Sequence, residues 1–392
     1  MNPALRRILL DPSRQTPLLV YAEEDLVRNA QGLFQGIRET FFGALSVHFA
    51  LKSCYRLPVL RSLHALGAGV EVMSLNEYRL ARAIGFSGPE ILVNGLGRPE
   101  VLLEEACSDA NRIILDCLED LRHLHGRPRV GLRLKVDLSD YPHKPYARES
   151  KLGLRWDSPE LRAVLDRCAD LELDLLHVHL ASEETDAGLF VHALERLCEY
   201  RGHLERQGVS IRSLDLGGGI GSLEEAEARA LFSTIGAAFT RCFPEGELLL
   251  EPGRYLVNSA GYVAATVTAV KRDGERAYVA TDAGTNTLMP HREASYRLCH
   301  PPSTPGQDGS PVALVDGITS LSSTVIPELR LDRLPSPGDR IILGHCGAYT
   351  TAMSQFWAFD PIPVAFFTRE GELVNDLSRD QIEGARRLLL GV

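Results

Sequence analysis

Eight short apolar runs, spread between residues 45 and 251, constrain the fold of this chain more than any other feature. Each run has the composition of a buried strand, and the segments between the runs are amphipathic in the manner of helices. The runs are VHFAL (47–51), GVEVM (69–73), EILVNG (90–95), RIILD (112–116), VGLRLKV (130–136), LLHVHLA (175–181), SLDLGGG (213–219) and ELLLEPG (247–253). This alternation predicts an α/β fold in which parallel strands close into a (β/α)8 TIM-like barrel. An open doubly wound sheet is the competing arrangement.

The pattern changes after residue 260. Runs rich in β-branched residues then follow one another with little helix between them, at 261–270, 276–280, 312–315, 339–343 and 364–367. Such runs, bounded by Gly, Pro and Asp, are typical of neighbouring strands in a sheet. We therefore predict a barrel over residues 21–261 and a C-terminal all-β domain over residues 262–392.

Composition excludes several classes of protein. The formal net charge of −10 over 392 residues disfavours a nucleic-acid-binding surface. No apolar stretch approaches the roughly 18 residues of a membrane span, and the N-terminus lacks a signal-peptide pattern, so we expect a cytoplasmic protein with no membrane partner. The eight cysteines are scattered without a CxxC pair or a Cys/His cluster, which indicates reduced thiols and no metal site.

Lys52 is unusual in a chain whose 42 basic residues include only five lysines. It is the only lysine among the first 134 residues, and it ends the apolar run 47–51. A primary amine at a strand end can form a Schiff base with a carbonyl cofactor, whereas the permanently charged guanidinium of arginine cannot. The alternative is a strand-end lysine that points into water.

Other residues that could bind or react with a ligand also stand at predicted strand ends, where barrel enzymes place their functional groups. They are Glu71, Asn94, Asp116, His179 with Ser182, Gly217-Gly218-Gly219, and Glu251 with Arg254. The set suits a phosphorylated aromatic aldehyde. The glycines let backbone N–H groups approach a phosphate, Arg254 adds a charged contact, and Glu251 can keep a pyridine nitrogen protonated. His179 can stack on a ring face.

Each of these residues also has an ordinary structural interpretation. The glycines could form only a tight turn, and Glu251 could form a strand-end ion pair with Arg254. His179 could be an interior histidine whose hydrogen bonds are satisfied by its neighbours.

Together these residues resemble the fold-type III pyridoxal-phosphate decarboxylases, the group that includes ornithine, arginine and diaminopimelate decarboxylases. The resemblance covers nearly the whole chain, and its motifs occur in the family's order. The matching segments are 16–21, Phe49-Ala50-Leu51-Lys52, 69–74 with Glu71, Asn94-Gly95 with Arg98, 177–182 with His179 and Ser182, 214–221 with Gly217, Gly218 and Gly219, Glu251-Pro252-Gly253-Arg254, and Gly347-Ala348-Tyr349-Thr350.

The resemblance implies that pyridoxal 5′-phosphate is bound to Lys52, with Glu71 at the family's acidic position. It implies that Glu251 contacts the pyridine nitrogen and that His179 stacks on the ring, with Ser182 also in contact. The glycine loop and Tyr349 would then reach the phosphate. It further implies a small-molecule amino-acid substrate, a head-to-tail homodimer with shared active sites, and an N-terminal strand within residues 1–20 that joins the β-domain.

The chain departs from the family where the substrate is recognised. The family carries a reactive cysteine followed by an acid at the positions of Ser320 and Leu321, and diaminopimelate decarboxylases carry an arginine at Met289. Trp357 falls near an aromatic position that borders the family's pocket. A serine hydroxyl is a far weaker acid than a thiol, and a leucine cannot pair with an ammonium group. We therefore expect a substrate whose distal end is uncharged, acylated or anionic, such as an amino-acid conjugate of siderophore or other specialised metabolism.

The group that returns a proton to the substrate carbon stays open between Ser320, a bound water and another thiol such as Cys346. Two other function classes also stay open. Alanine racemases share the barrel-plus-β-domain plan, and the family includes non-catalytic antizyme inhibitors. The Gly347–Thr350 motif and the glycine triplet favour a decarboxylase over a racemase. Lys52, Glu251 and Arg254 argue against a chain without catalysis.

Overall fold

The structure is a computed structural model. It describes residues 1–109, 111–138, 150–168, 171–180, 182–284, 286–288, 296–300, 311–316, 324–330, 334–354 and 359–390. The chain divides into two compact units. The barrel unit comprises Arg28–Lys52 and Leu60–Tyr255, and the sheet unit comprises Met1–Val27, Ser53–Val59 and Leu256–Val392.

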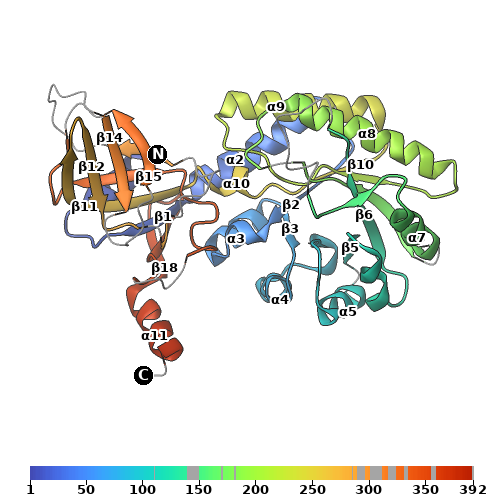
Figure 1. Cartoon of the computed structure of the whole chain (residues 1–392), viewed down its shortest axis with the longest axis horizontal. Helices are drawn as coiled ribbons and strands as arrows, with labels where there is room; N and C mark the ends of the chain where they lie inside the picture. The colour runs from blue at the N-terminus through green and yellow to red at the C-terminus, as the bar shows by residue number, and fades with distance from the viewer. Residues whose placement is uncertain are drawn as a thin grey trace. The chain divides into compact units, whose positions relative to one another are not determined.

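Eight parallel strands of the described chain close into a barrel in the barrel unit (Figure 1). They are β2 (Ala44–Ala50), β3 (Gly69–Val72), β4 (Ile91–Val93), β5 (Arg112–Leu115), β6 (Arg129–Lys135), β8 (Glu172–His177), β9 (Ser213–Asp215) and β10 (Glu247–Leu250). Pairing of β5 with β6 completes the ring, and the two-residue β7 (Leu154–Arg155) adds to the edge of β6. Each of the eight predicted runs overlaps one of these strands, so the predicted barrel is confirmed and the open-sheet alternative is wrong.

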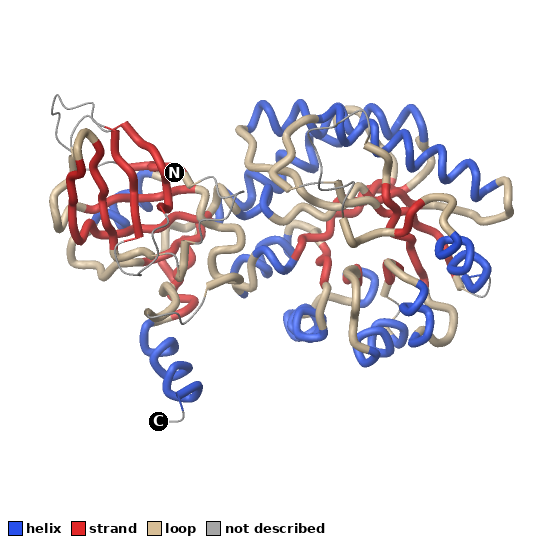
Figure 2. The backbone as a smooth tube through the Cα atoms, in the orientation of Figure 1, coloured by secondary structure: helices blue, strands red, loops and turns tan. Residues whose placement is uncertain are grey.

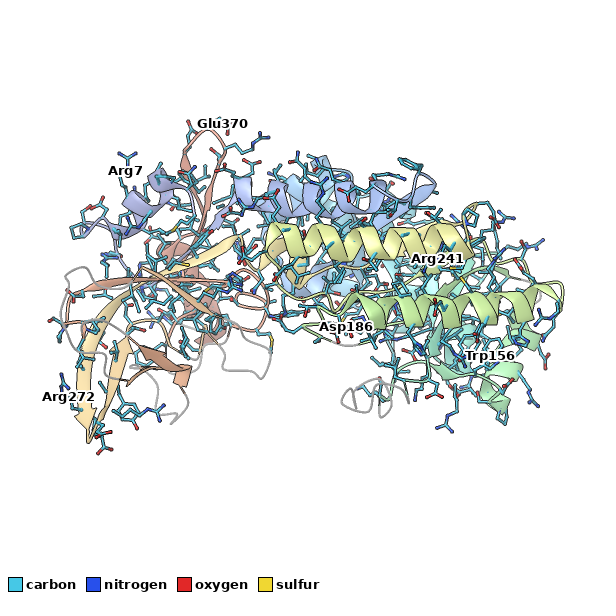
Figure 3. The ribbon with its side chains drawn as sticks, turned by 90° about the horizontal axis from the view of Figure 1, so that it is seen from above. Arg7, Trp156, Asp186, Arg241, Arg272 and Glu370 are labelled. Atoms are coloured by element: carbon cyan, nitrogen blue, oxygen red, sulfur yellow. The ribbon has the colours of Figure 1, made fainter. Side chains whose placement is uncertain are left out.

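Helices alternate with the strands along the chain, and α4, α5 and α8 pack on β3, β5 and β8. The helices are α2 (Glu23–Arg38), α3 (Leu57–Ala65), α4 (Leu75–Ile84), α5 (Glu100–Ser108), α7 (Pro159–Arg167), α8 (Ala187–Glu205), α9 (Glu225–Cys242) and α10 (Arg254–Val257), with 3-10 turns η1 (Leu51–Ser53), η2 (Gly88–Glu90) and η3 (Leu118–His123). Ser74 caps α4 by accepting the Glu77 N–H, and Gly85 ends it with a left-handed φ of 114°. In Figure 3, α8 and α9 lie side by side, with Asp186 at the start of α8 and Arg241 near the end of α9.

The sheet unit contains the remaining strands, drawn in red in Figure 2. They are β1 (Leu18–Ala22), β11 (Gly261–Asp273), β12 (Arg276–Thr281), β13 (Arg297–His300), β14 (Pro311–Asp316), β15 (Thr324–Arg330), β16 (Arg340–Gly344), β17 (Val364–Phe367) and β18 (Leu373–Leu377). The N-terminal strand β1 pairs antiparallel with β11 and parallel with β17.

The sheet unit is mostly sheet rather than all β. Helix α11 (Arg379–Leu390) follows the last strand, and α1 (Pro3–Leu10) precedes the first. The predicted C-terminal β-domain is therefore confirmed as a mostly-sheet unit, and the helix at residues 379–390, where apolar residues recur at a helical period, is an element that the strand pattern did not include.

Each unit has its own apolar core. Leu92, Ile114, Leu175 and Leu249 fill the barrel, while Leu5 and Leu9 of α1 pack on the sheet against Val20 and Phe367. None of the described helices has both the length and the apolar character needed to cross a membrane.

Candidate active site

Lys52 lies at the mouth of the barrel, two residues beyond the end of β2. Its Nζ lies 2.5 Å from Glu71 Oε2, and the two side chains are 35% and 3% exposed. Register places Glu71 of β3 beside Ala50, the last residue of β2. The amine therefore pairs with a barrel residue and is still accessible. The alternative, a lysine that extends into water, is not what the structure shows. Burial raises the pKa of Glu71, although the charge of Lys52 acts against that shift.

Glu251 follows the last barrel strand and is almost fully buried. Its Oε1 accepts a hydrogen bond from Asn94 Nδ2 at 3.1 Å and lies 3.4 Å from His177 Nε2. Burial opposes ionisation of Glu251, but His177 and the charge of Lys52 hold the pKa of the carboxyl well below its ordinary value. The alternative of an ion pair between Glu251 and Arg254 is not what the structure shows.

Strand register explains why a third titratable group joins Glu251. Asp215 of β9 pairs with His177 of β8 on one side and with Leu249 of β10 on the other. One ligand-type atom from each of His177, Asp215 and Glu251 lies within 4.8 Å of the other two. Burial, and then the charge of Glu251, raises the pKa of Asp215 well above its ordinary value, and burial lowers the pKa of His177. The arrangement therefore favours the neutral forms of Asp215 and His177.

The glycine triplet lies against His179 and Glu251. The Gly218 N–H donates to His179 Nδ1 at 3.3 Å, and the Glu251 N–H donates to the Gly217 carbonyl at 2.7 Å. A Cβ at Gly217, whose φ is +64°, would lie 2.5 Å from the Val178 carbonyl oxygen, and one at Gly218 would lie 2.3 Å from that of Glu251. Neighbouring backbone therefore excludes any side chain at either position.

His179 is a neutral imidazole at neutral pH. Burial, followed by the charges of Arg133 and Lys52, lowers its pKa to about 3. Because Nδ1 accepts from Gly218, the ring proton is assigned to Nε2. Arg133, a buried residue of β6, lies 3.7 Å from the carboxylate of Asp116 and brings a positive charge to the same end of the barrel.

Arg254 begins α10 beside the glycine loop. Its Nε lies 3.0 Å from Glu183 Oε1, and the other oxygen of that carboxylate accepts the Ser222 N–H at 3.4 Å. The Arg254 side chain is 8% exposed. It therefore has a fixed position at the barrel mouth and pairs with Glu183 rather than with Glu251.

The remaining predicted residues are Ser182, Tyr349 and four positions that the structure does not describe. Ser182 is exposed, next to Glu183. Tyr349 belongs to the sheet unit, where its backbone is left-handed with a φ of 62° and its N–H donates to the Ser53 carbonyl at 2.7 Å. Ser320, Leu321, Met289 and Trp357 lie outside the described residues.

Sequence reasoning gave no role to three side chains that the structure places here. His177 and Asp215 were visible only as members of strand motifs. Arg133 was hidden in an apolar run, although a charge at an inward position of a barrel strand is itself a signal of a site. Conversely, Asn94 was noticed as a strand-end residue, but its contact with Glu251 depends on the tertiary structure.

These side chains fit pyridoxal phosphate. The group needs an accessible amine, a buried carboxylate for the pyridine nitrogen, a flat uncharged partner for the ring and a backbone cradle for the phosphate. Lys52, Glu251, His179 and the loop 217–219 offer those four features at one end of one barrel.

Comparison with known proteins agrees with this fit. Residues 32–258, more than half of the chain, match the family model described as pyridoxal-dependent decarboxylase, pyridoxal binding domain. The diaminopimelate decarboxylase of Deinococcus radiodurans is 32% identical over 368 residues, covering 91% of this chain and 92% of that protein. This chain belongs to the pyridoxal-dependent decarboxylases. It is a carboxy-lyase that uses pyridoxal phosphate.

Solved structures of this family share the whole fold. The diaminopimelate decarboxylase of M. jannaschii has a TM-score of 0.81 at 21% identity, covering 94% of this chain and 91% of that one. The lysine decarboxylase of Selenomonas ruminantium has a TM-score of 0.76 at 20% identity, covering 94% and 96%. At such identities these structures support the architecture of the decarboxylase, and its substrate needs separate arguments.

Proposed function

We propose that this decarboxylase holds its cofactor through Lys52 and acts on an amino acid whose distal end carries no free ammonium group. When bound, pyridoxal phosphate supplies a ring that takes up the electrons left behind by departing CO₂. Lys52 suits the attachment because its amine is accessible and is oriented by Glu71 at 2.5 Å. An arginine could not replace it, since a guanidinium does not form an imine under these conditions.

Glu251 and His179 would set the electronic state of the ring. The ionised carboxylate of Glu251 favours a proton on the pyridine nitrogen, and Asn94 at 3.1 Å keeps that carboxylate oriented. A neutral His179 can face the ring without charge repulsion, and its Nδ1 is held by the Gly218 N–H. These two contacts support roles in stabilising charge and positioning the ring.

The phosphate would bind at the glycine loop. Gly217, Gly218 and Gly219 leave backbone there without side chains, and Arg254 supplies a buried cation beside it. We assign Tyr349 and Ser182 to the same group through the family resemblance. We also propose the head-to-tail homodimer with shared active sites that the resemblance implies.

The substrate proposal depends on one observation, the Ser320-Leu321 pair. The family's acid at position 321 recognises a distal amine, and leucine offers that amine neither charge nor a hydrogen bond. Free ornithine, lysine and diaminopimelate should therefore be poor substrates, although the relatives are named for diaminopimelate and lysine. An amino-acid conjugate with an acylated, uncharged or anionic end fits better.

A substrate panel tests this proposal. The purified protein, loaded with pyridoxal phosphate, is incubated with free basic amino acids and with their N-acylated and acidic counterparts, and CO₂ is measured against amine product. Stoichiometric CO₂ from conjugates alone supports the proposal. Rapid turnover of free lysine, ornithine or diaminopimelate contradicts it, and turnover without CO₂ would indicate the racemase alternative.

A double substitution adds a matched control. Ser320→Cys combined with Leu321→Asp restores the family's residues, so activity toward a free diamino acid should rise by about 10-fold or more as an ion pair with the distal ammonium becomes possible. Leu321→Asn introduces an amide of the same size as the aspartate but without its charge, and should therefore give a much smaller gain in this activity.

Cys346 is a weak candidate for the proton donor. It is fully buried in the sheet unit, and its Sγ lies 3.3 Å from the Gly344 carbonyl oxygen. Burial raises the pKa of the thiol well above its ordinary value. This setting supports the structural role, and Ser320 or a bound water stays the proposed donor. Cys346→Ala should keep the rate and the product stereochemistry.

A further inference from the structure

Asp215 is a buried acid to which neither the cofactor nor the substrate proposal gives a role. It is 0% exposed. Its Oδ1 accepts the Gly217 N–H at 2.7 Å, while Oδ2 is buried and accepts no hydrogen bond from a donor of the described residues. Because an ionised carboxylate in the interior needs several donors or a cation, an oxygen left in this state argues against a negative charge on Asp215.

Glu251, the neighbouring acid, is supplied with donors. Asn94 has a fixed amide orientation because its Oδ1 accepts the Gly95 N–H at 2.8 Å, so its Nδ2 must face Glu251. His177 Nε2 adds a second contact at 3.4 Å. Of the two carboxyl groups, Glu251 is therefore the better site for the charge.

The two acids are too close for both to be ionised without a counter-ion between them. Their nearest ligand-type oxygens fall within 4.8 Å of each other. Two carboxyl groups in such a setting commonly share one proton. The charged and titratable groups around them include Arg112 for Asp215. For Glu251 they include His177, Lys52, His179, Glu71 and His48. Burial and the charge of Glu251 outweigh Arg112 and raise the pKa of Asp215.

We propose that Asp215 carries the proton of this pair and donates it in a hydrogen bond to Glu251, so that the cluster holds one negative charge rather than two. The inference rests on the proposed role of Glu251 toward the ring nitrogen. A single carboxylate charge matches the single positive charge of a protonated pyridine. Asp215 acts through Glu251 and is therefore a positioning residue.

Infrared difference spectroscopy tests the proton directly, on the full chain with and without pyridoxal phosphate. Subtracting the spectrum of Asp215→Asn from that of the unmodified protein at neutral pH should reveal the carbonyl stretch of one protonated carboxylic acid. Asp174→Asn is the matched control, because Asp174 is equally buried but paired with Arg112 and Arg129. That subtraction should reveal carboxylate bands only. Carboxylate bands without an acid band for Asp215→Asn would overturn the proposal.

Cofactor affinity gives a second measurement. Asp215→Ala removes the donor to Glu251 and should weaken pyridoxal phosphate binding by about 10-fold or more, as the loss of a hydrogen bond to a buried charged group implies. Asp215→Asn keeps an acceptor for Gly217 and a neutral donor for Glu251, so it should restore most of that affinity. An asparagine variant that binds as weakly as the alanine variant would overturn the proposal.

The proposal and the proposed function can fail separately. If Glu251→Gln leaves the affinity and absorbance of the cofactor unchanged, the role of Glu251 toward the ring nitrogen is wrong. The acid band of Asp215 in the cofactor-free protein still decides whether the two carboxyl groups share a proton.

Discussion

Both ends of the barrel contain buried titratable groups, but the two ends differ in the partners that they give to these groups. At the N-terminal ends of the strands, Asp174 Oδ2 lies 3.2 Å from Arg112 and 2.5 Å from Arg129. Glu247 Oε2 accepts from Arg112 at 3.2 Å and from Ser213 at 2.8 Å. Each acid there pairs with a cation, which Asp215 lacks, although Asp174 Oδ1 is buried without a hydrogen-bond partner among the described residues.

The pKa shifts at this N-terminal end favour the charged forms. Burial opposes ionisation of Glu247, but a hydrogen bond from Ser46 and the charge of Arg112 lower its pKa. At the C-terminal end the shifts of Asp215, Glu71, His177 and His179 disfavour charge, whereas the pKa of Glu251 is lowered. The acids at the N-terminal end are paired with arginines of the chain, whereas the C-terminal end is arranged for a ligand that brings its own charges.

Lys52→Ala should have the largest effect, because it removes the amine that holds the cofactor. Turnover should fall by at least about 10⁴-fold, in line with the loss of a covalent catalytic group. The visible absorbance of the protonated Schiff base should disappear. Lys52→Arg keeps the charge beside Glu71 and should be equally inactive. Lys271→Ala, at an exposed lysine of β11, should retain both the band and the turnover.

Asp174→Ala should destabilise the fold rather than impair the chemistry. The change leaves Arg112 with Glu247 as its remaining acid, and it leaves Arg129, whose side chain is 43% exposed, partly hydrated. It should therefore cost about 1–3 kcal/mol in the free energy of unfolding. Glu199→Ala, which breaks the exposed pair with Arg196, should cost less than about 1 kcal/mol. Urea denaturation measures both. If the folded Asp174→Ala protein loses affinity for pyridoxal phosphate, the two ends are not independent.

Glu251→Gln should lower kcat by about 100-fold, because it removes preorganised charge at the ring nitrogen. The matched control is Glu247→Gln, at the opposite end of the same strand β10. This control should retain turnover and lose only stability. Equal losses of kcat in the two variants would contradict the contrast between the ends.

The contributions of Asp215 and Glu247 to the pH dependence of stability should have opposite signs. The raised pKa of Asp215 contributes stability that is complete below its unfolded value of about 3.9 and is lost as pH rises, by up to about 1.4 kcal/mol per pH unit. Glu247, whose pKa is lowered, contributes stability above its unfolded value that is lost as pH falls through the folded value. Urea unfolding of the cofactor-free protein between acid and neutral pH measures both effects. Asp215→Asn should flatten the first and Glu247→Gln the second, and an unchanged profile in either variant would refute the assignment for that end.

Much of the barrel could be predicted because its information is local. A buried parallel strand has the pattern of an apolar run, and a covering helix has that of an amphipathic segment, so each of the eight predicted runs overlaps its strand. The strands β13, β15 and β18 and the helix α11 were missed because they are short, partly polar or terminal. In such segments, pairing with neighbours outweighs the local pattern.

The candidate site divides in the same way. Lys52, Glu251 and the glycine triplet stand out in the sequence because each combines an unusual residue type with a strand end. The partners of these residues did not stand out. Glu183 as the partner of Arg254, and Asp215 beside Glu251, became visible only with strand register and side-chain positions.

The sequence by itself therefore determined the barrel and the residue types at its mouth, because hydrophobic period and strand-end position are properties of short segments. Only the tertiary structure decided which titratable groups lie close together, and hence which of them stay ionised. Electrostatic interactions depend on distance and burial, and both are set by residues far apart in the chain. The amine of Lys52 and the carboxylate of Glu251 could be predicted from the sequence, whereas the proton inferred on Asp215 required the fold.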